Sequence, residues 1–401
     1  MTPKLLAKFI DKQNYDVRVT RNGRWIDQKC AYDALTFVAD CIFEYITLNG
    51  DRAFTSPQIW KSEYAINNVQ AFFGKPDPEN PATVDEYNKF YRQPMKLLAA
   101  SGVLTERKVG IAIEFKVAEI HILEYIAAKD RNSMDFLCLY IEKTLKDSGL
   151  LDGFDSFFDE QTISSYQSLK AKFSDFCFEY TPIKNPAEPG RIFAKVLNPL
   201  AYKRHLKGTE RGRLSRNMMT LNKLQYNQPN WRDVNSGKDK NIARGDFTPA
   251  ISPQMYKYKM SKAKRNLRSF NDKYNDKRSE VTDKFSIGEV ATHMHHIFPQ
   301  NEFVTISEFI ENLIALTPAQ HMNLAHPNGN THIIDEDYQH TCLINKTASI
   351  RENLVDDHQS PIIYDFKDFM TVLNVGFNTD HFDRLEPNDF SSVIGGILHY
   401  Q

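Results

Sequence analysis

The most informative part of this 401-residue chain is residues 292–332, THMHHIFPQNEFVTISEFIENLIALTPAQHMNLAHPNGNTH. Half of the twelve histidines fall within it, beside a Pro-Asn-Gly turn. Imidazole is the commonest side-chain metal ligand, and its near-neutral pKa also suits proton transfer. A lone histidine is usually an ordinary core or surface residue, but a cluster of this density predicts a functional site. Its members are His293, His295, His296, His321, His326 and His332.

Two of these histidines, His295 and His296, are adjacent in the chain. In an extended segment, neighbouring side chains point to opposite faces. One imidazole could therefore hold a metal ion while the other reaches toward a water molecule. The pair predicts a metal ligand next to a proton acceptor.

The spacing of the cluster resembles the signature of the HNH (ββα-metal) nuclease family. A proline follows the second histidine of the pair by three positions, Asn312 follows it by sixteen, and His321 follows Asn312 by nine. The resemblance implies that His295 and His321 are metal ligands. It also implies that the catalytic residues are His296, the general base, and Asn312, a structural residue that orients the base. His326 stays open as a third ligand or as a phosphate contact.

The chain departs from the family pattern in two respects. Many family members flank the second ligand with cysteines that bind a structural zinc ion, but Thr317 and Gln320 stand there instead. A histidine rather than an aspartate in the first ligand place leaves the metal open. Mg²⁺ is the expected cofactor, and Mn²⁺, Ni²⁺ and Zn²⁺ are alternatives because imidazoles hold Mg²⁺ weakly. Without structural zinc, the ββα-metal motif must be held together by its apolar residues, which are Ile297, Phe298, Leu313, Ile314 and Leu316.

A basic segment is hidden by the overall net charge of −1. From Lys195 to Arg278 there are 21 lysine and arginine residues against six acidic ones, a local net charge of +15, so the remainder carries −16. Double-stranded DNA is a natural partner for such a segment, and a solvated, flexible basic linker is the alternative. The DNA-binding candidates in it are Lys203, Arg204, Lys207, Arg211, Arg213 and Arg216.

Two stretches of this region also resemble segments that precede HHIFP in restriction-type nucleases. They are RIFAKVLNPLAYKRHLKGTERGRLSR (191–216) and YNQPNWRD (226–233). Three aromatic residues of the region, Tyr202, Tyr226 and Trp231, either pack on sugars or bases or form local core. The positive charge predicts salt-dependent affinity for DNA, but it does not separate specific from non-specific binding.

The N-terminal part predicts three helices followed by a two-stranded hairpin. The helices fall at 30–48, 56–74 and about 83–101, and the hairpin falls at 103–117. This is the order of a winged helix-turn-helix, which seats one helix in a major groove of DNA. Lys89 and Arg92 share a face of the third helix and are further DNA-binding candidates. The alternatives are a small α+β domain with a solvated charged face, or a winged helix used only for protein contacts.

These features predict a multidomain α+β protein with a mainly helical N-terminal part. The expected domains are a winged-helix DNA-recognition domain at 1–120, a helical connector at 121–190, a basic DNA-binding segment at 191–285, and an HNH nuclease domain with a C-terminal helical tail at 286–401. The five cysteines form no CxxC pair, which is typical of reduced thiols in a cytoplasm. No apolar stretch is long enough for a membrane span, so we expect no membrane partner.

The combined prediction is a sequence-specific double-stranded DNA endonuclease of the restriction type (type II) that uses one metal ion and leaves 5′-phosphate ends. One such centre cuts one strand, so a double-strand break needs a homodimer or two visits. The alternatives are a modification-dependent or mobile-element nuclease, and a winged-helix DNA-binding regulator with an inactive nuclease remnant. A zinc hydrolase unrelated to nucleic acids fits the four residues HMHH, but the basic segment argues against it.

Overall fold

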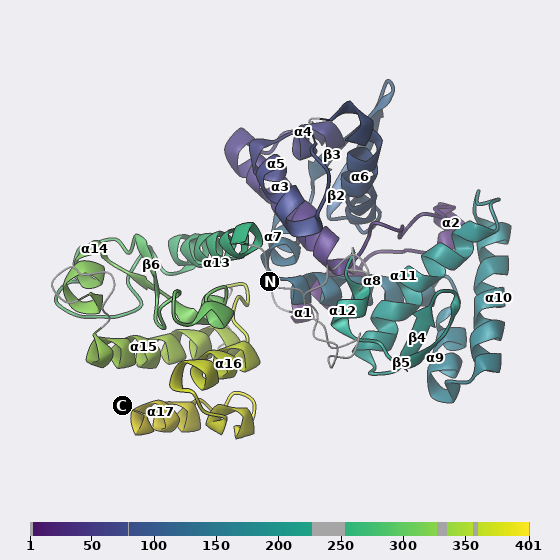
Figure 1. Ribbon diagram of the computed structural model, residues 1–401. Helices are drawn as coiled ribbons and strands as arrows, with labels where there is room; N and C mark the ends of the chain where they lie inside the picture. The colour runs from purple at the N-terminus through teal and green to yellow at the C-terminus, as the bar shows by residue number, and fades with distance from the viewer. Residues whose placement is uncertain (1–2, 79, 227–252, 327–334, 356–359, 401) are drawn as a thin grey trace. The chain divides into compact units, whose positions relative to one another are not determined.

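The structure, a computed structural model, describes residues 3–78, 80–226, 253–326, 335–355 and 360–400. The chain forms two compact units, Met1–Ala250 and Ile251–Gln401 (Figure 1). The described residues are mostly helical and include three small sheets, so the fold is α+β as predicted. The division between the units falls inside 191–285, a range that the sequence predicts as one segment. In the described part of the chain, each helix is too short or too polar to cross a lipid bilayer.

The first unit contains, between residues 30 and 117, the helices and the hairpin that the sequence predicts. β1, β3 and β2 form an antiparallel sheet in that order, with Phe54 opposite Phe115. The predicted second helix is divided in two, because Ser62 accepts a hydrogen bond from the backbone N–H of Ala65 and begins a new helix. The elements are α3 (Tyr32–Asn49), β1 (Phe54–Thr55), α4 (Ser56–Trp60), α5 (Glu63–Phe73), α6 (Val84–Ala100), β2 (Leu104–Val109) and β3 (Ala112–Val117).

The rest of the first unit is helical apart from one short hairpin. The proline-rich stretch 185–190 begins a helix, since Pro189 occupies its first turn, where a backbone N–H has no partner within the helix. The hairpin turns at Arg211 and Gly212, which both have positive φ. The elements are α1 (Pro3–Asp11), α2 (Val17–Thr20), α7 (Ile120–Ala128), α8 (Asp130–Asp147), α9 (Leu151–Glu160), α10 (Ile163–Tyr180), α11 (Ala187–Lys203), β4 (Lys207–Glu210), β5 (Arg213–Met218) and α12 (Leu221–Leu224).

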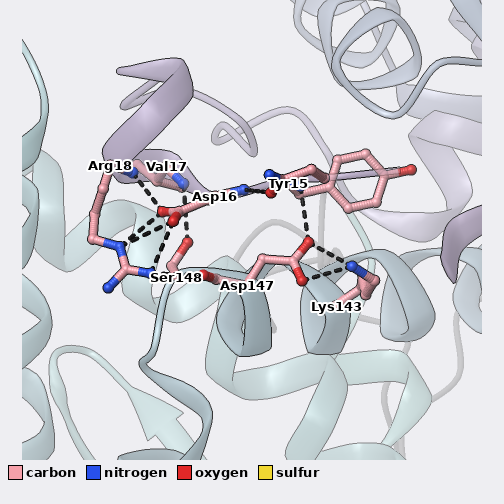
Figure 2. A network of polar contacts seen from close by, with 8 residues as sticks. Tyr15, Asp16, Val17, Arg18, Lys143, Asp147 and Ser148 are labelled. Carbon is pink, nitrogen blue, oxygen red and sulfur yellow. Dashed lines mark hydrogen bonds and ion pairs between the residues drawn. The ribbon is translucent and has the colours of Figure 1, made fainter. Parts of the chain in front are cut away.

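A network of polar contacts ties the N-terminal segment to the end of α8 (Figure 2). The backbone N–H of Tyr15 donates to the Asp147 carboxylate at 2.9 Å, and that of Val17 donates to Ser148 Oγ at 3.0 Å. The Arg18 guanidinium donates to the backbone carbonyl of Asp147 at 2.9 Å. These bonds satisfy backbone groups on both partners, so they fix where the segment before α3 crosses the helical core.

The second unit is built around an antiparallel pair of short strands, β6 and β7, in which His295 lies opposite Ile314. The five apolar residues that the sequence assigns to its core, among them Ile297 and Leu313, are at most 2 % exposed. A short helix, a π-helical turn and three longer helices follow β7, and α13 packs against both strands. The main elements are α13 (Pro253–Tyr274), β6 (His293–His296), β7 (Leu313–Leu316), α14 (Pro318–Gln320), a π-helical turn (His321–Ala325), α15 (Glu336–Val355), α16 (Phe366–Phe377) and α17 (Phe390–His399).

Hydrogen bonds hold the turn after β7 at the two positions where the sequence lacks cysteines. Gln320 is fully buried, and its Nε2 donates to the backbone carbonyl of Val281 at 2.8 Å and to Asp283 at 3.0 Å. Its Oε1 accepts from Ser279 Oγ at 2.6 Å and from the backbone N–H of Thr317 at 3.0 Å. A fully bonded buried amide specifies one arrangement of the chain. This network therefore fixes the start of the π-helical turn.

Candidate metal centre

Three histidines of the second unit converge. One ring nitrogen from each of His295, His321 and His326 lies within 4.8 Å of the others. His295 comes from β6, and the other two follow β7 in the π-helical turn and the residue after it. A π-helix bonds residue i to residue i+5, so its wider turn brings residues five apart onto the same side. The local backbone thus places His326 with the two histidines that the sequence predicts as ligands.

A fourth histidine packs against this group. The His293 ring stacks on His321 with a centroid separation of 4.6 Å and an interplanar angle of 27°. The rings of His295 and His326 meet edge to face at 5.1 Å. His332, which belongs to the same cluster in the sequence, lies outside the described residues. The ring contacts restrict the orientation of the imidazoles, which a metal site needs.

The surroundings of His295 and His321 keep these two imidazoles neutral. Burial lowers the pKa of His295 well below its usual value, and the neighbouring imidazoles of His321 and His326 lower it further. The pKa of His321 falls to about 4, first because of burial and then because of neighbouring imidazoles and Lys264. Metal binding requires deprotonated ligands. At pH 7 both nitrogen donors are therefore ready to bind without first releasing a proton.

The residues fit a divalent transition metal. Nδ1 of His321 is buried and has no hydrogen-bond partner among the described residues. A buried polar atom without a partner costs free energy, which binding to a metal ion would recover. Three imidazoles match the preference of Zn²⁺ and Ni²⁺ for nitrogen ligands, whereas Mg²⁺ prefers oxygen. The cluster is therefore a candidate metal centre with three protein ligands.

His296, the residue after His295 on β6, is not one of the three histidines of this cluster. Its side chain is 8 % exposed, and Nε2 lies 3.1 Å from the backbone carbonyl of Ser307. Because a carbonyl can only accept, Nε2 carries the proton and Nδ1 keeps the lone pair. Burial, followed by the charge of Lys264, lowers the pKa of His296 to about 4. His296 is thus a neutral base at pH 7.

Asn312 locks the chain that follows His296. It is fully buried, and its Oδ1 accepts from the backbone N–H of Phe298 at 2.9 Å. Its Nδ2 donates to the carbonyl of the same residue at 3.1 Å. The backbone carbonyl of Asn312 accepts from Ile297 at 2.9 Å. These are the side-chain-to-backbone bonds that the sequence predicts for Asn312, and they fix the chain directly after His296.

One face of α13 forms the wall of a cavity beside the cluster, and sequence reasoning missed it. The cavity has a volume of about 560 Å³. Arg268 donates to the backbone carbonyl of Thr292 at 2.6 Å, which fixes its guanidinium at the edge of β6. The i, i+3, i+4, i+7 spacing of polar residues in α13 is the signal that could have identified this face. The lining residues are Ser261, Lys264, Arg265, Arg268, Thr292, His293, Met294 and His321.

The DNA-binding candidates of residues 203–216 lie in the first unit, on or next to the hairpin of β4 and β5. Lys203 and Arg204 form ion pairs within that unit, and Arg204 lies 2.8 Å from Asp155. Lys207 is half-buried. The other three candidates are exposed and have no ion-pair partner among the described residues. They are Arg211, Arg213 and Arg216.

Among the aromatic candidates, Tyr226 belongs to the local core. Its ring contacts Phe73 at 5.6 Å and Phe90 at 5.0 Å, and its hydroxyl donates to Glu86 at 3.0 Å. Tyr202 is half-buried at the end of α11, and Trp231 lies outside the described residues. The local-core alternative therefore holds for Tyr226.

Lys89 and Arg92 line a separate cavity of about 1020 Å³ within the first unit. Arg92 has no ion-pair partner in the described part of the chain, and neither does Lys184 on the facing segment. The lining holds three acidic residues, two of which pair with Arg24 and one with Lys96. The basic residues of this cleft are Arg21, Arg24, Lys89, Arg92, Lys96 and Lys184.

Comparison with known proteins does not assign the chain to a family. No family model matches it, and neither a curated protein nor a solved structure is found to be similar. The function is therefore argued from the geometry of the two units and from the sequence pattern.

Proposed function

We propose that this chain is a metal-dependent endonuclease of the HNH type that hydrolyses double-stranded DNA. The observation that carries the proposal is that ring nitrogens of His295, His321 and His326 lie within 4.8 Å of one another. His296 directly follows the first of these ligands in the chain. The spacing of the HNH signature alone required two of these three histidines to meet. The third supports the proposal independently, because the sequence pattern left its role open.

The residues of the chain supply the parts that phosphodiester hydrolysis needs. A divalent ion held by the three imidazoles would stabilise charge on the phosphoryl oxygens and on the leaving oxygen. His296 takes the proton from the attacking water at Nδ1, the ring nitrogen that keeps its lone pair. Asn312 keeps this base in place through its two bonds to Phe298. Cleavage in this mode leaves 5′-phosphate and 3′-hydroxyl ends.

The donor set supports Mn²⁺, Ni²⁺ or Zn²⁺ over Mg²⁺, the cofactor that the sequence first suggests. Mg²⁺ prefers oxygen ligands and keeps several bound waters, so three imidazole nitrogens would bind it weakly. Nitrogen ligands suit the later transition metals, whose affinity for them rises along the first row. We therefore propose a transition metal as the ion that gives the highest rate.

The first unit supports separate recognition of DNA. Its strand order β1-β3-β2, with α4 packed against β1 and α6 against β2, supports the winged helix that the sequence predicts. The exposed face of α6 carries Lys89 and Arg92, and the cleft beside it contains more cations than acidic groups. Two DNA-contacting units in one chain favour a restriction-type enzyme that recognises a sequence with one unit and cuts with the other.

Digestion of plasmid and phage DNA by the full chain tests this proposal. We expect cleavage with Mn²⁺, Ni²⁺ or Zn²⁺, slower cleavage with Mg²⁺, and none with EDTA, because the metal supplies the charge stabilisation. Fragment ends should carry 5′-phosphate and be joined by a ligase. Discrete fragments would support sequence specificity, whereas a smear would indicate a general nuclease. Parallel digestion of methylated and unmethylated plasmid separates a modification-dependent enzyme from a restriction enzyme.

Two outcomes would contradict the proposal. DNA binding without cleavage over all four metals would indicate a DNA-binding regulator with an inactive nuclease remnant. Failure to bind DNA at low salt would favour a metal hydrolase that acts on another substrate.

A further inference from the structure

Two cations on α13 face the cavity beside the candidate metal centre without a carboxylate partner. Lys264 is half-buried and pairs with no acidic group in the described ranges of the second unit. Arg268, one turn further along the same face, makes a single side-chain hydrogen bond to the part of the chain that the structure describes, and it goes to the backbone carbonyl of Thr292. That bond uses one of the five N–H donors of its guanidinium, so the remaining donors are left for a ligand.

Two buried lysines, Lys75 and Lys346, show the contrasting arrangement, in which the lysine has a carboxylate partner. Lys346 is fully buried and pairs with Glu280 at 2.9 Å, and Lys75 pairs with Glu86. A half-buried charge without such a partner is costly in a folded protein. Burial accordingly lowers the pKa of Lys264. The cost falls when an anion enters the cavity.

A metal ion at the histidine cluster would increase this need for an anion. Lys264 lies close enough to His295, His296 and His321 for its charge to lower the pKa of all three imidazoles. His321 itself lines the cavity. A divalent ion there would add two positive charges next to an unneutralised lysine and arginine. A carboxylate ligand would bring only one negative charge into the cavity. A DNA strand carries successive phosphates, so it would place one charge beside Lys264 and another beside Arg268.

We propose that Lys264 and Arg268 form a phosphate-binding site, in which Lys264 holds the DNA phosphate next to the metal centre and Arg268 holds an adjoining one. The inference rests on the proposed function, because it names DNA as the ligand, but it concerns binding rather than the hydrolytic step. It places a DNA contact of the second unit on α13, in addition to the candidates of residues 203–216 in the first unit. Lys264 is then a binding residue that also positions the phosphate for attack.

Duplex binding by the metal-free full chain tests the site. A fluorescent DNA duplex is titrated in EDTA over a range of salt concentrations with the wild type and with Lys264→Met, Lys264→Arg and Arg268→Met. Each phosphate contact contributes about 0.9 to the slope of log K against log salt. We expect Lys264→Met and Arg268→Met each to flatten the slope by about one, and Lys264→Arg to keep it. Lys367→Met is the matched control, since it removes an exposed lysine from α16 of the same unit.

Two further measurements separate phosphate binding from a structural role. Isothermal titration with Ni²⁺ should show metal affinity in Lys264→Met at least equal to that of the wild type, because a repelling charge is removed. The single-turnover cleavage rate should fall by about 10²-fold, as for other donors aimed at a reacting phosphate or carbonyl. Melting curves of the variants in EDTA check that they fold.

The outcomes also distinguish this inference from the proposed function. If the wild type cleaves DNA but Lys264→Met matches it in salt slope and rate, the phosphate site is wrong and the nuclease proposal stands. If the wild type binds but never cleaves DNA, and Lys264→Met still flattens the slope, the phosphate site stands and the nuclease proposal fails. A loss of metal affinity in Lys264→Met would overturn the site in favour of a structural role.

Discussion

Replacing His296 with alanine should reduce the cleavage rate by about 10²–10⁴-fold, the range typical for loss of a general base. Nδ1 of His296 keeps its lone pair because Nε2 donates to the carbonyl of Ser307, and no other described group makes a hydrogen bond with this ring. Affinity for DNA and for Ni²⁺ should stay within a few-fold of the wild type, since His296 lies outside the three-histidine cluster. Single-turnover rates, fluorescence anisotropy and isothermal titration measure the three quantities.

The matched control is His340→Ala. His340 is as buried as His296, at 8 % exposure, and likewise has a ring nitrogen against a backbone carbonyl, 2.8 Å from that of Glu336. It lies on α15 and is not part of the metal cluster. We expect it to lower stability without changing the rate of the folded protein. An unchanged rate in His296→Ala, or an equal rate loss in both variants, would refute the assignment of the base.

The environment of His296 also predicts the pH dependence of the proposed reaction. The pKa of His296 is lowered to about 4 by burial and by Lys264, so its imidazole stays neutral as pH falls to about 5. The acid limb of kcat/KM should then lie below pH 6. If the base had an ordinary histidine pKa of about 6.5, the enzyme would lose half its activity at about pH 6.5. A bound metal ion would lower the pKa further by charge repulsion. A limb at pH 6.5 would show that another group is the base.

The sequence predicted the part of the site that depends on local geometry. The four residues that the sequence assigned to the site lie within 27 residues, which fold into one pair of strands and one turn: His295, His296, Asn312 and His321. Their spacing in the sequence was therefore enough to predict that they lie close together. The role of His326 could not be decided in this way. An α-helix would place residues 321 and 325 on one face. The π-helical turn instead brings His326, five positions after His321, into the cluster.

The helical spacing of polar residues in α13 marks a polar face in the sequence, but the position of that face beside the histidines could not be predicted, because it depends on tertiary packing. The charge count from Lys195 to Arg278 identified a basic segment. It could not show which of the lysine and arginine side chains form ion pairs with acidic residues in the folded protein. Arg204 pairs with an acidic residue of the first unit, whereas Lys264 faces a cavity in the second. Similarly, Gln320 looked like a missing zinc ligand, and its actual partners, Val281 and Asp283, come from a loop far upstream in the chain.

Replacing His326 with alanine should remove high-affinity metal binding and with it cleavage. The loss in Ni²⁺ or Zn²⁺ affinity should exceed the roughly 10–100-fold that is typical when a hydrogen-bonding neighbour of a ligand is lost. His326 is 6 % exposed, and its ring nitrogen lies within 4.8 Å of those of His295 and His321. It does not line the cavity in which Lys264 lies, so a phosphate in that cavity is the weaker alternative for its role.

Comparison with two other variants separates a ligand from a phosphate contact. If His326 is a ligand, His326→Ala and His295→Ala lose metal affinity to a similar degree, and the salt dependence of metal-free DNA binding does not change. If it contacts phosphate, metal affinity survives and the salt slope flattens by about one. His293→Ala is the control, because this residue stacks on His321 at 4.6 Å without belonging to the three-nitrogen cluster. A stacked neighbour only restrains the ring it covers, so its loss should weaken metal binding far less than the loss of a donor nitrogen.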